Sequence, residues 1–187
     1  MNKIKDLVKQ FLESSNEVIS QLDSKVIKNF TEQLKKAKRV YTVGVGSLGL
    51  LAKGFTTKLT YLGYETYFIG ETLMPSPGKN DLLIAISESG EADYTVRAAR
   101  IAKNLGATVV AITSCPQSTL GKLADLNIEI KWKEEIPKDE LKEREGELLT
   151  PNSSLFEITT LVLLNAIMSE LADKKIKIKG QTKIQHN

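Results

Sequence analysis

VYTVGVGSLG, residues 40–49, joins an apolar run rich in β-branched residues to a glycine-rich loop and then to a segment that favours a helix. LLIAISESGE, residues 82–91, repeats this order with a loop of serine and glycine. A strand that enters a helix through such a loop directs unpaired backbone N–H groups and small hydroxyls to one point, in front of the positive end of the helix dipole. Both loops would lie at the carboxyl ends of strands in one α/β sheet, where such sheets bind ligands. The pair therefore predicts an anion site.

The composition is that of one ordinary globular domain. The chain has 187 residues, of which 41% are hydrophobic and 26% are charged, so we expect one domain over residues 1–187. The net charge of +3 is concentrated in residues 174–187, a basic tail with five lysines and no acidic residue. The rest of the chain is close to neutral, which gives little reason to expect nucleic acid as a partner.

Few residues are available for metal or histidine chemistry. Cys115 is the only cysteine, and His186, next to the last residue, is the only histidine. These counts exclude an intrachain disulfide and argue against a His or Cys metal site and a Ser-His-Asp triad. The charged start lacks the apolar core of a signal peptide, and the longest nearly apolar stretch, residues 158–168, is shorter than a bilayer span. We therefore expect a cytoplasmic protein with no membrane contact.

Two helices are expected in residues 1–37. Apolar residues at helical spacing predict a first amphipathic helix with one buried stripe, formed by Ile4, Leu7, Val8, Phe11, Leu12, Ile19 and Leu22. Asp23 and Ser24 are suitable N-caps for a second helix. Both helices need an apolar surface to pack on, which the rest of the chain must supply.

Residues 38–173 alternate between strand and helix patterns and are expected to form the α/β core. Strands are predicted at about 39–43, 65–69, 81–86, 108–113 and 126–130, and helices at about 49–62, 92–105, 118–124 and 153–171. Repeated strand–loop–helix units with right-handed crossovers give a parallel sheet covered on both faces. The predicted fold is a doubly wound α/β sandwich with about five strands.

Two linkers interrupt this pattern. Residues 72–80 contain two prolines and a glycine, which predict a loop with few conformational options. Residues 133–150 are rich in Lys and Glu and predict a solvated excursion before the last helix, with a mobile lid as the alternative.

A dinucleotide site is one interpretation of the glycine-rich loop, because residues 44–49 match Gly-x-Gly-x-x-Gly after a strand. That site also needs an acidic residue at the end of the following strand, whereas Glu65 stands at its start and Glu71 beyond its end. Residues 87–91 favour a different ligand, since hydroxyls and backbone amides together saturate the acceptor oxygens of a phosphate. A sugar phosphate is therefore favoured over NAD.

Five segments of the chain resemble the sugar isomerase (SIS) domain family, and most closely its 6-phospho-3-hexuloisomerase branch. They are GVGSLGLLAK at 44–53, LTYLG at 59–63, GET at 70–72, ISESGE at 86–91 and LFE at 155–157. The resemblance implies a three-layer α/β/α sandwich of the flavodoxin-like type with a five-stranded parallel sheet. It also implies a homo-oligomer, a dimer or a tetramer, with sites at subunit interfaces. The implied activity is the isomerisation of phosphorylated sugars without a cofactor or a metal.

The chain departs from the hexuloisomerase pattern at four positions. Ser47 and Leu48 stand where the first loop of the family has Arg and Ser, Ala92 stands where the second loop has Thr, and Tyr61 replaces a His of many relatives. Two phosphate-binding hydroxyls, one cation and a histidine able to help open a sugar ring are therefore missing. Ser47, Thr95 and Lys53 are the candidates to compensate.

The residues expected to bind substrate lie in the two loops and are Gly44, Gly46, Ser47, Ser87, Glu88, Ser89 and Gly90. Two serines followed by a glycine, beside a second glycine-rich loop, favour contact with a phosphate. Simpler roles stay open for both sets of residues. The glycines suit any tight strand-to-helix turn, and the two serines suit N-caps.

Glu157 is the first candidate for the catalytic base. Moving a proton between adjacent sugar carbons through an enediol requires a base, and a carboxylate in a partly apolar site suits that role. The resemblance at 155–157 favours Glu157, whereas a glutamate in a first helical turn also stabilises the helix dipole or completes a capping box. Glu91 is the second candidate and Glu71 the third. Tyr61 is a further catalytic candidate, with packing as its alternative role.

The sequence thus predicts a cytoplasmic isomerase that converts a 3-keto to a 2-keto hexose 6-phosphate, of the type that takes arabino-3-hexulose 6-phosphate to fructose 6-phosphate. One alternative is a regulatory SIS protein that binds sugar phosphates without turnover, and another is an isomerase of a different sugar phosphate. An NAD-linked oxidoreductase is disfavoured, because no residues remain for a second ligand-binding module.

Overall fold

The computed structural model describes residues 3–131 and 151–184, including the side chains of residues 154–173 in the last helix. Its strands are β1 (Val40–Val43), β2 (Thr66–Phe68), β3 (Leu82–Ile86), β4 (Thr108–Thr113) and β5 (Leu126–Glu129). Its helices are α1 (Lys3–Ser20), α2 (Ser24–Lys36), α3 (Gly46–Tyr61), α4 (Asp93–Asn104), α5 (Thr119–Leu123) and α7 (Pro151–Ile184). The expected strands and helices are all present, most of them within three residues of their predicted ends. The 133–150 excursion and its lid alternative lie outside the described residues.

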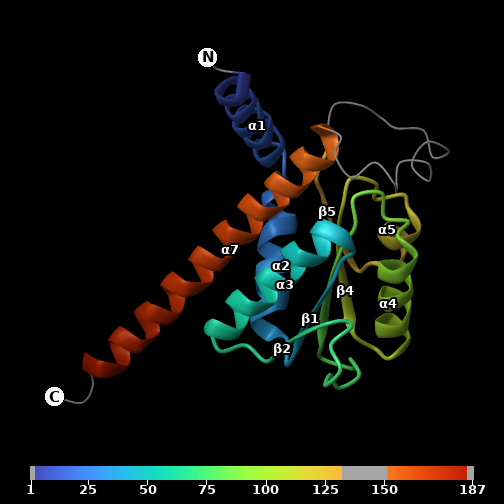
Figure 1. Ribbon diagram of the computed structural model, residues 1–187. Helices are drawn as coiled ribbons and strands as arrows, with labels where there is room; N and C mark the ends of the chain where they lie inside the picture. Colours follow the sequence, from blue (N-terminus) through green and yellow to red (C-terminus); the bar gives the residue numbers. More distant parts are fainter. Residues whose placement is uncertain (1–2, 132–150, 185–187) are drawn as a thin grey trace.

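The five strands form one parallel sheet in the order β2-β1-β3-β4-β5, which confirms the predicted fold class (Figure 1). Every neighbouring pair is parallel, from β1 beside β2 to β4 beside β5. The residues of β1 and β3 are buried without exception, as expected for central strands covered on both faces.

Helices cover the two faces of the sheet and complete three layers. Leu82, Ile84 and Ile86 of β3 pack in one apolar cluster with side chains of α2, α3 and α7. The alternate residues Leu83 and Ala85 pack on the other face, where α4 and α5 supply the partners. Figure 1 shows α4 and α5 on one side of the sheet and α2, α3 and α7 on the other.

The prediction of a buried apolar stripe along α1 is wrong for a single chain. Ile4, Leu7, Val8 and Leu12 are 42–77% exposed, and the buried residues of α1 are Ser15 and Val18, near its end. The reason is visible in Figure 1, where α1 projects past the sheet and meets the start of α7. Thr159 of α7 there donates a 3.1 Å hydrogen bond to the hydroxyl oxygen of Ser15.

Helix α7 runs further than predicted, to Ile184 rather than to about residue 171, so its backbone continues through most of the basic tail. Among the described residues, one segment, Ser154–Asp173, has the length and composition to cross a membrane, a longer stretch than the sequence analysis gave. Its side chains Phe156, Leu164 and Leu171 are buried against the sheet and its helices. The segment thus packs one side on the core of the domain, while Leu161 and Val162 on it are exposed.

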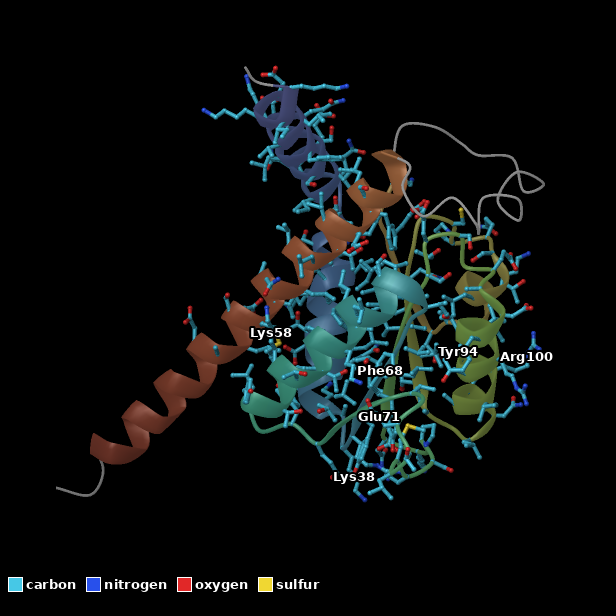
Figure 2. All side chains as sticks on the ribbon, in the orientation of Figure 1. Lys38, Lys58, Phe68, Glu71, Tyr94 and Arg100 are labelled. Carbon is cyan, nitrogen blue, oxygen red and sulfur yellow. The ribbon has the colours of Figure 1, made fainter. Side chains whose placement is uncertain are left out.

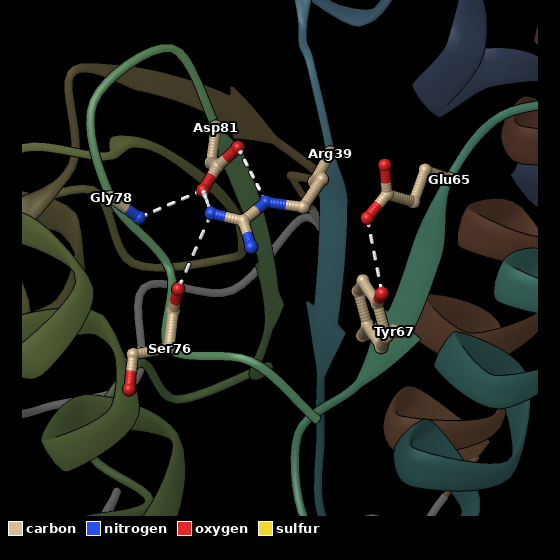
Figure 3. Close-up of polar contacts among 6 residues, drawn as sticks. All are labelled: Arg39, Glu65, Tyr67, Ser76, Gly78 and Asp81. Atoms are coloured by element: carbon tan, nitrogen blue, oxygen red, sulfur yellow. Dashed lines mark hydrogen bonds and ion pairs between the residues drawn. The ribbon is translucent and has the colours of Figure 1, made fainter. Parts of the chain in front are cut away.

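An ion pair joins the amino ends of the two central strands (Figure 3). Arg39 binds both carboxylate oxygens of Asp81, with Nη2 2.6 Å from Oδ2 and Nε 3.1 Å from Oδ1. Asp81 also accepts a 2.8 Å hydrogen bond from the N–H of Gly78, and Arg39 donates to the carbonyl of Ser76. The proline-rich linker is therefore held at the amino edge of the sheet, and the carboxyl edge is left to the two Gly and Ser loops.

Candidate functional site

The topology creates a crevice where β1 and β3 lie side by side. The chain leaves β1 toward α3 on one face and leaves β3 toward α4 on the other, so the loops 44–46 and 87–92 diverge at the carboxyl edge. In open α/β sheets such a switch point is the usual place for a ligand. Both predicted loops therefore begin side by side at the same edge of the sheet and border this crevice.

The two helices that begin at this crevice lack side-chain caps. The N-cap of α3 is Val45 and the N-cap of α4 is Ala92, and neither makes a capping hydrogen bond. In contrast, Asp23 caps α2 and Ser118 caps α5 through side-chain oxygens. The first N–H groups of a helix have no partner within the helix, so α3 and α4 present donors to the crevice together with their positive dipole ends. This arrangement suits an anion.

The serines of the second loop have their hydroxyl oxygens turned to the loop backbone. Ser87 Oγ accepts a hydrogen bond of 3.1 Å from the N–H of Gly90, and Ser89 Oγ accepts one of 3.2 Å from the N–H of Glu91. A hydroxyl that accepts in this way still has its own hydrogen to donate. Ser87 is buried and Ser89 half-buried, so both hydroxyls are held in a compact turn at the end of β3.

Two glycines are required by the geometry of the loops. A Cβ on Gly90, which has φ of 68°, would lie 2.0 Å from Ser118 Oγ. A Cβ on Gly44 would lie 2.8 Å from the carbonyl oxygen of Leu48 in the first turn of α3. The glycine of the first loop thus permits the tight strand-to-helix turn, as the simpler interpretation holds. Ser47 is exposed in the first turn of α3.

The acidic residues of the second loop are tied to the segment that follows β4. The carbonyl oxygen of Glu88 accepts hydrogen bonds from Ser114 N–H at 3.0 Å and from Thr113 Oγ1 at 2.9 Å. Glu91 Oε1 accepts one of 2.9 Å from the N–H of Thr119, the first residue of α5. Cys115 lies in the same segment, where burial first, and then the charges of nearby glutamates including Glu88, raise the pKa of its thiol.

Glu157 lies near the start of α7, next to a core residue. Phe156 is fully buried in the core, and Glu157 beside it is half-buried. Helices α3 and α7 both start at the carboxyl edge and run the same way, and Lys58 Nζ donates a hydrogen bond to Asn165 Oδ1 between them (Figures 1 and 2). Leu50 precedes Lys58 by eight residues on α3, and Glu157 precedes Asn165 by eight residues on α7. This register puts Glu157 at the level of the first turns of α3.

Tyr61 is not brought to the loops within one chain. It is the last residue of α3 and 85% exposed, and it follows Gly46 by 15 residues, about 22 Å along the helix axis at ~1.5 Å per residue. It lines instead a pocket of about 490 Å³ between α3 and the edge strand β2. Lys53 and Glu71 line the same pocket and form an ion pair of 2.6 Å. Neither this pocket nor the pairing of Lys53 with Glu71 was predicted from the sequence.

Tyr94 is a residue at the crevice that the sequence analysis missed. From α4 its hydroxyl donates a 3.3 Å hydrogen bond to the carbonyl of Ile69, just after β2. A Cβ on Gly70 would lie 2.9 Å from the hydroxyl oxygen of Tyr94. Since β1 lies between β2 and β3, the side chain reaches across the end of β1. Figure 2 shows Tyr94 on the sheet side of α4. An aromatic residue in a first helical turn was the only signal in the sequence.

Comparison with known proteins identifies the family of the chain. The family model described as "SIS domain" matches residues 33–143. The 3-hexulose-6-phosphate isomerase of Bacillus subtilis is 30% identical over 185 residues, which are 99% of this chain and 97% of that protein. A crystal structure from Methanococcus jannaschii, for which a molecular function of 3-hexulose-6-phosphate isomerase is inferred, is 29% identical with a TM-score of 0.73 and covers 90% of this chain and 89% of its own. The Vibrio vulnificus NanR protein complexed with ManNAc-6P shares the fold, with a TM-score of 0.76 at 18% identity over 99% of this chain and 68% of its own.

Proposed function

Because this chain belongs to the SIS domain family, we propose that it is a phosphosugar isomerase that converts a 3-keto hexose 6-phosphate to the 2-keto isomer. One observation of the structure carries the proposal. The two helices that start at the switch point have no side-chain cap, and two serine hydroxyls stand beside them. A phosphate dianion supplies the acceptors that these donors lack.

The phosphate would bind at the end of β3. Ser87 and Ser89 would donate their hydroxyl hydrogens, and the first N–H groups of α4 would complete its coordination. Gly44, Gly46 and Ser47 would face it from the start of α3. Glu88 and Gly90 would contribute through the shape of their turn, since their carbonyl groups already bond the segment after β4. The two helix dipoles both favour the negative charge.

The sugar carbons would extend from the phosphate toward β2. Neighbouring strands lie about 4.8 Å apart, so the ends of β3, β1 and β2 span roughly 10 Å. That span is comparable to an extended six-carbon phosphosugar. Tyr94 crosses the end of β1 along this path, and the Lys53–Glu71 pair stands at its far end.

The reaction needs one proton transfer between adjacent carbons. A base removes the proton from C2 of the 3-keto sugar, the C3 carbonyl becomes a hydroxyl of the C2–C3 enediol, and the proton returns to C3 while the C2 hydroxyl becomes the carbonyl. No electrons are exchanged with a second substrate. We assign the base to Glu157, a carboxylate beside the buried Phe156 at the level of the first turns of α3. Tyr61, at the far end of α3, has a place in this scheme only if a second chain brings it to the crevice.

We also propose that the chain forms a homo-oligomer in the cytoplasm. The exposed side chains Ile4, Leu7, Val8 and Leu12 give α1 an apolar face without a partner in the described part of the chain, and Leu161 and Val162 of α7 are exposed as well. Exposed apolar side chains gathered on one face of a helix are typical of interfaces between subunits. A dimer or a tetramer would cover it.

The deciding experiment is the conversion of arabino-3-hexulose 6-phosphate to fructose 6-phosphate, with other sugar phosphates assayed in parallel. Exchange of the carbon-bound proton with deuterated solvent is measured in the same samples, because an enediol permits exchange even when net conversion is slow. Conversion with exchange is the expected result. Binding of sugar phosphates without exchange would identify a regulatory protein. Binding of NAD, with no thermal stabilisation by any sugar phosphate, would identify an oxidoreductase.

A further inference from the structure

We propose that Glu91 is a positioning residue that holds the anion-binding turn, residues 87–91, against the start of α5, and that it does not act as the catalytic base. This inference rests on the proposed function, since it concerns how the same phosphate site is kept in shape. It assigns a role to a carboxylate that the sequence alone left as a candidate base.

The side chain of Glu91 is bound to the backbone of another element. Its Oε1 accepts a 2.9 Å hydrogen bond from the N–H of Thr119, at the first position of α5. That N–H has no partner within its own helix, and a carboxylate at a helix N-terminus is stabilised both by this bond and by the helix dipole. Glu91 thereby shares with Ser118, whose Oγ accepts from Gly121 N–H at 3.1 Å, the capping of this helix.

The backbone of Glu91 connects this anchor to the phosphate site. Its N–H donates a 3.2 Å hydrogen bond to Ser89 Oγ. One residue thus binds α5 through its side chain and fixes the orientation of the Ser89 hydroxyl through its main chain. Displacement of Glu91 would release the Ser89 hydroxyl from the direction in which it can donate to a phosphate.

The rest of the turn is held from the same side. The carbonyl of Gly90 accepts a 3.0 Å hydrogen bond from Leu120 N–H, and Ser118 Oγ fills the space beside Gly90 where a Cβ would lie. Glu88 contributes its carbonyl to Ser114 N–H and Thr113 Oγ1. Residues 88, 90 and 91 therefore face the segment after β4. The contact of Glu91 is made by its own side chain, so a substitution can remove that contact without changing the backbone.

The test compares two variants of Glu91 in the full chain. Glu91→Gln retains an oxygen that can accept from Thr119 N–H, whereas Glu91→Ala removes it. We expect Glu91→Ala to weaken the binding of fructose 6-phosphate about tenfold, as for one lost charge-assisted hydrogen bond near the ligand. Glu91→Gln should bind within about threefold of the parent and keep its solvent exchange at saturating substrate.

Asp23→Ala is the matched control. Asp23 accepts a 2.8 Å hydrogen bond from Lys25 N–H and caps α2, a helix that does not begin at the crevice. Loss of this cap should lower the thermal midpoint to a similar extent as Glu91→Ala but leave the affinity unchanged. A change of affinity in Glu91→Ala alone therefore separates positioning from general stability.

Three results would overturn the inference. If Glu91→Ala bound fructose 6-phosphate as tightly as the parent, the positioning role would be refuted. If Glu91→Gln lost solvent exchange at saturating substrate, Glu91 would be the base. Inorganic phosphate serves as a second probe. A parent protein that binds phosphate but no sugar phosphate contradicts the proposed function, and the phosphate affinities of the variants then decide on Glu91. A parent that binds neither anion overturns both.

Discussion

Arg39 Nη2 lies 2.6 Å from Asp81 Oδ2, and this ion pair connects the residue before β1 to the residue before β3 (Figure 3). The Asp81 side chain is fully buried, and that of Arg39 is 19% exposed. The pair stands at the amino edge of the same two strands whose carboxyl ends carry the two proposed anion loops. We therefore expect that this ion pair affects stability and not ligand binding, since it lies at the opposite ends of β1 and β3 from the proposed site.

Arg39→Met should lower the free energy of unfolding by about 3 kcal/mol, because it leaves the carboxylate of Asp81 buried without its cation. Urea unfolding measures this change. Lys35→Met, which removes a partly exposed pair with Glu32, is the control and should cost less than about 1 kcal/mol. The affinity for fructose 6-phosphate should stay the same in both variants, and a loss of affinity in Arg39→Met would show that the two edges are coupled.

Ser87→Ala and Ser89→Ala should each weaken the binding of sugar phosphates by about 1–3 kcal/mol, since each removes a hydroxyl donor to the phosphate. Calorimetric titration with fructose 6-phosphate measures the effect. Ser169→Ala, whose hydroxyl donates to the carbonyl of Asn165 on an exposed face of α7, is the control. If both loop variants bound as tightly as this control, the serines would only stabilise the turn.

Glu157→Gln should reduce the exchange of the carbon-bound proton by on the order of a hundredfold or more, because the amide retains the shape of the side chain but cannot accept the proton. Its affinity for fructose 6-phosphate should change little. Undiminished exchange in this variant would exclude Glu157 as the base. Glu71, which pairs with Lys53 at the far end of the proposed sugar path, would then be the next carboxylate to substitute.

Tyr41 should make the protein less stable at alkaline pH. Burial raises the pKa of its phenol to about 12 from an ordinary value of 10.0. The unfolded chain therefore ionises Tyr41 first, so the contribution of the neutral phenol is complete below pH 10 and is lost as the pH rises to 12. Two pKa units correspond to roughly 2–3 kcal/mol.

Urea unfolding at a series of pH values from 9 to 12 tests this prediction. Tyr41→Phe is the informative variant, since other tyrosines, including Tyr64, also have a raised pKa and contribute to the loss in the parent. The difference in unfolding free energy between parent and variant should shift in favour of the variant over this pH range. A difference that stays constant with pH would contradict the assignment.

The apolar face of α1 should be covered in solution by another copy of the chain. Light scattering at micromolar concentration should give a mass of at least twice the 20.7 kDa of one chain. Leu7→Glu together with Leu12→Glu places charges on this face, where both side chains are exposed in the single chain, and should reduce the mass without unfolding the sheet. A parent protein that scatters as a monomer would refute the proposal.

The sequence by itself determined the elements and the edge of the sheet at which the two proposed anion loops lie. The β-branched and apolar runs at 40–43 and 82–86 are strands because their side chains fill a core on both faces. The Gly and Ser loops follow them directly, and the carboxyl ends of parallel strands share one edge. Both properties are local, so residues close together in the chain were sufficient to predict them.

The tertiary structure alone decided which side chains meet. The carboxylate of Glu91 accepts a hydrogen bond from Thr119, 28 residues later, and Tyr94 reaches Ile69 across the end of β1. Neither contact could be predicted from the spacing of these residues. The apolar residues of α1 follow a helical period, yet the length of that helix carries most of them past the sheet that would cover them. The periodicity of apolar residues predicts which face of a helix is apolar. Which surface packs on that face depends on where segments distant in the sequence lie in the fold, and the spacing of residues within one helix does not determine this.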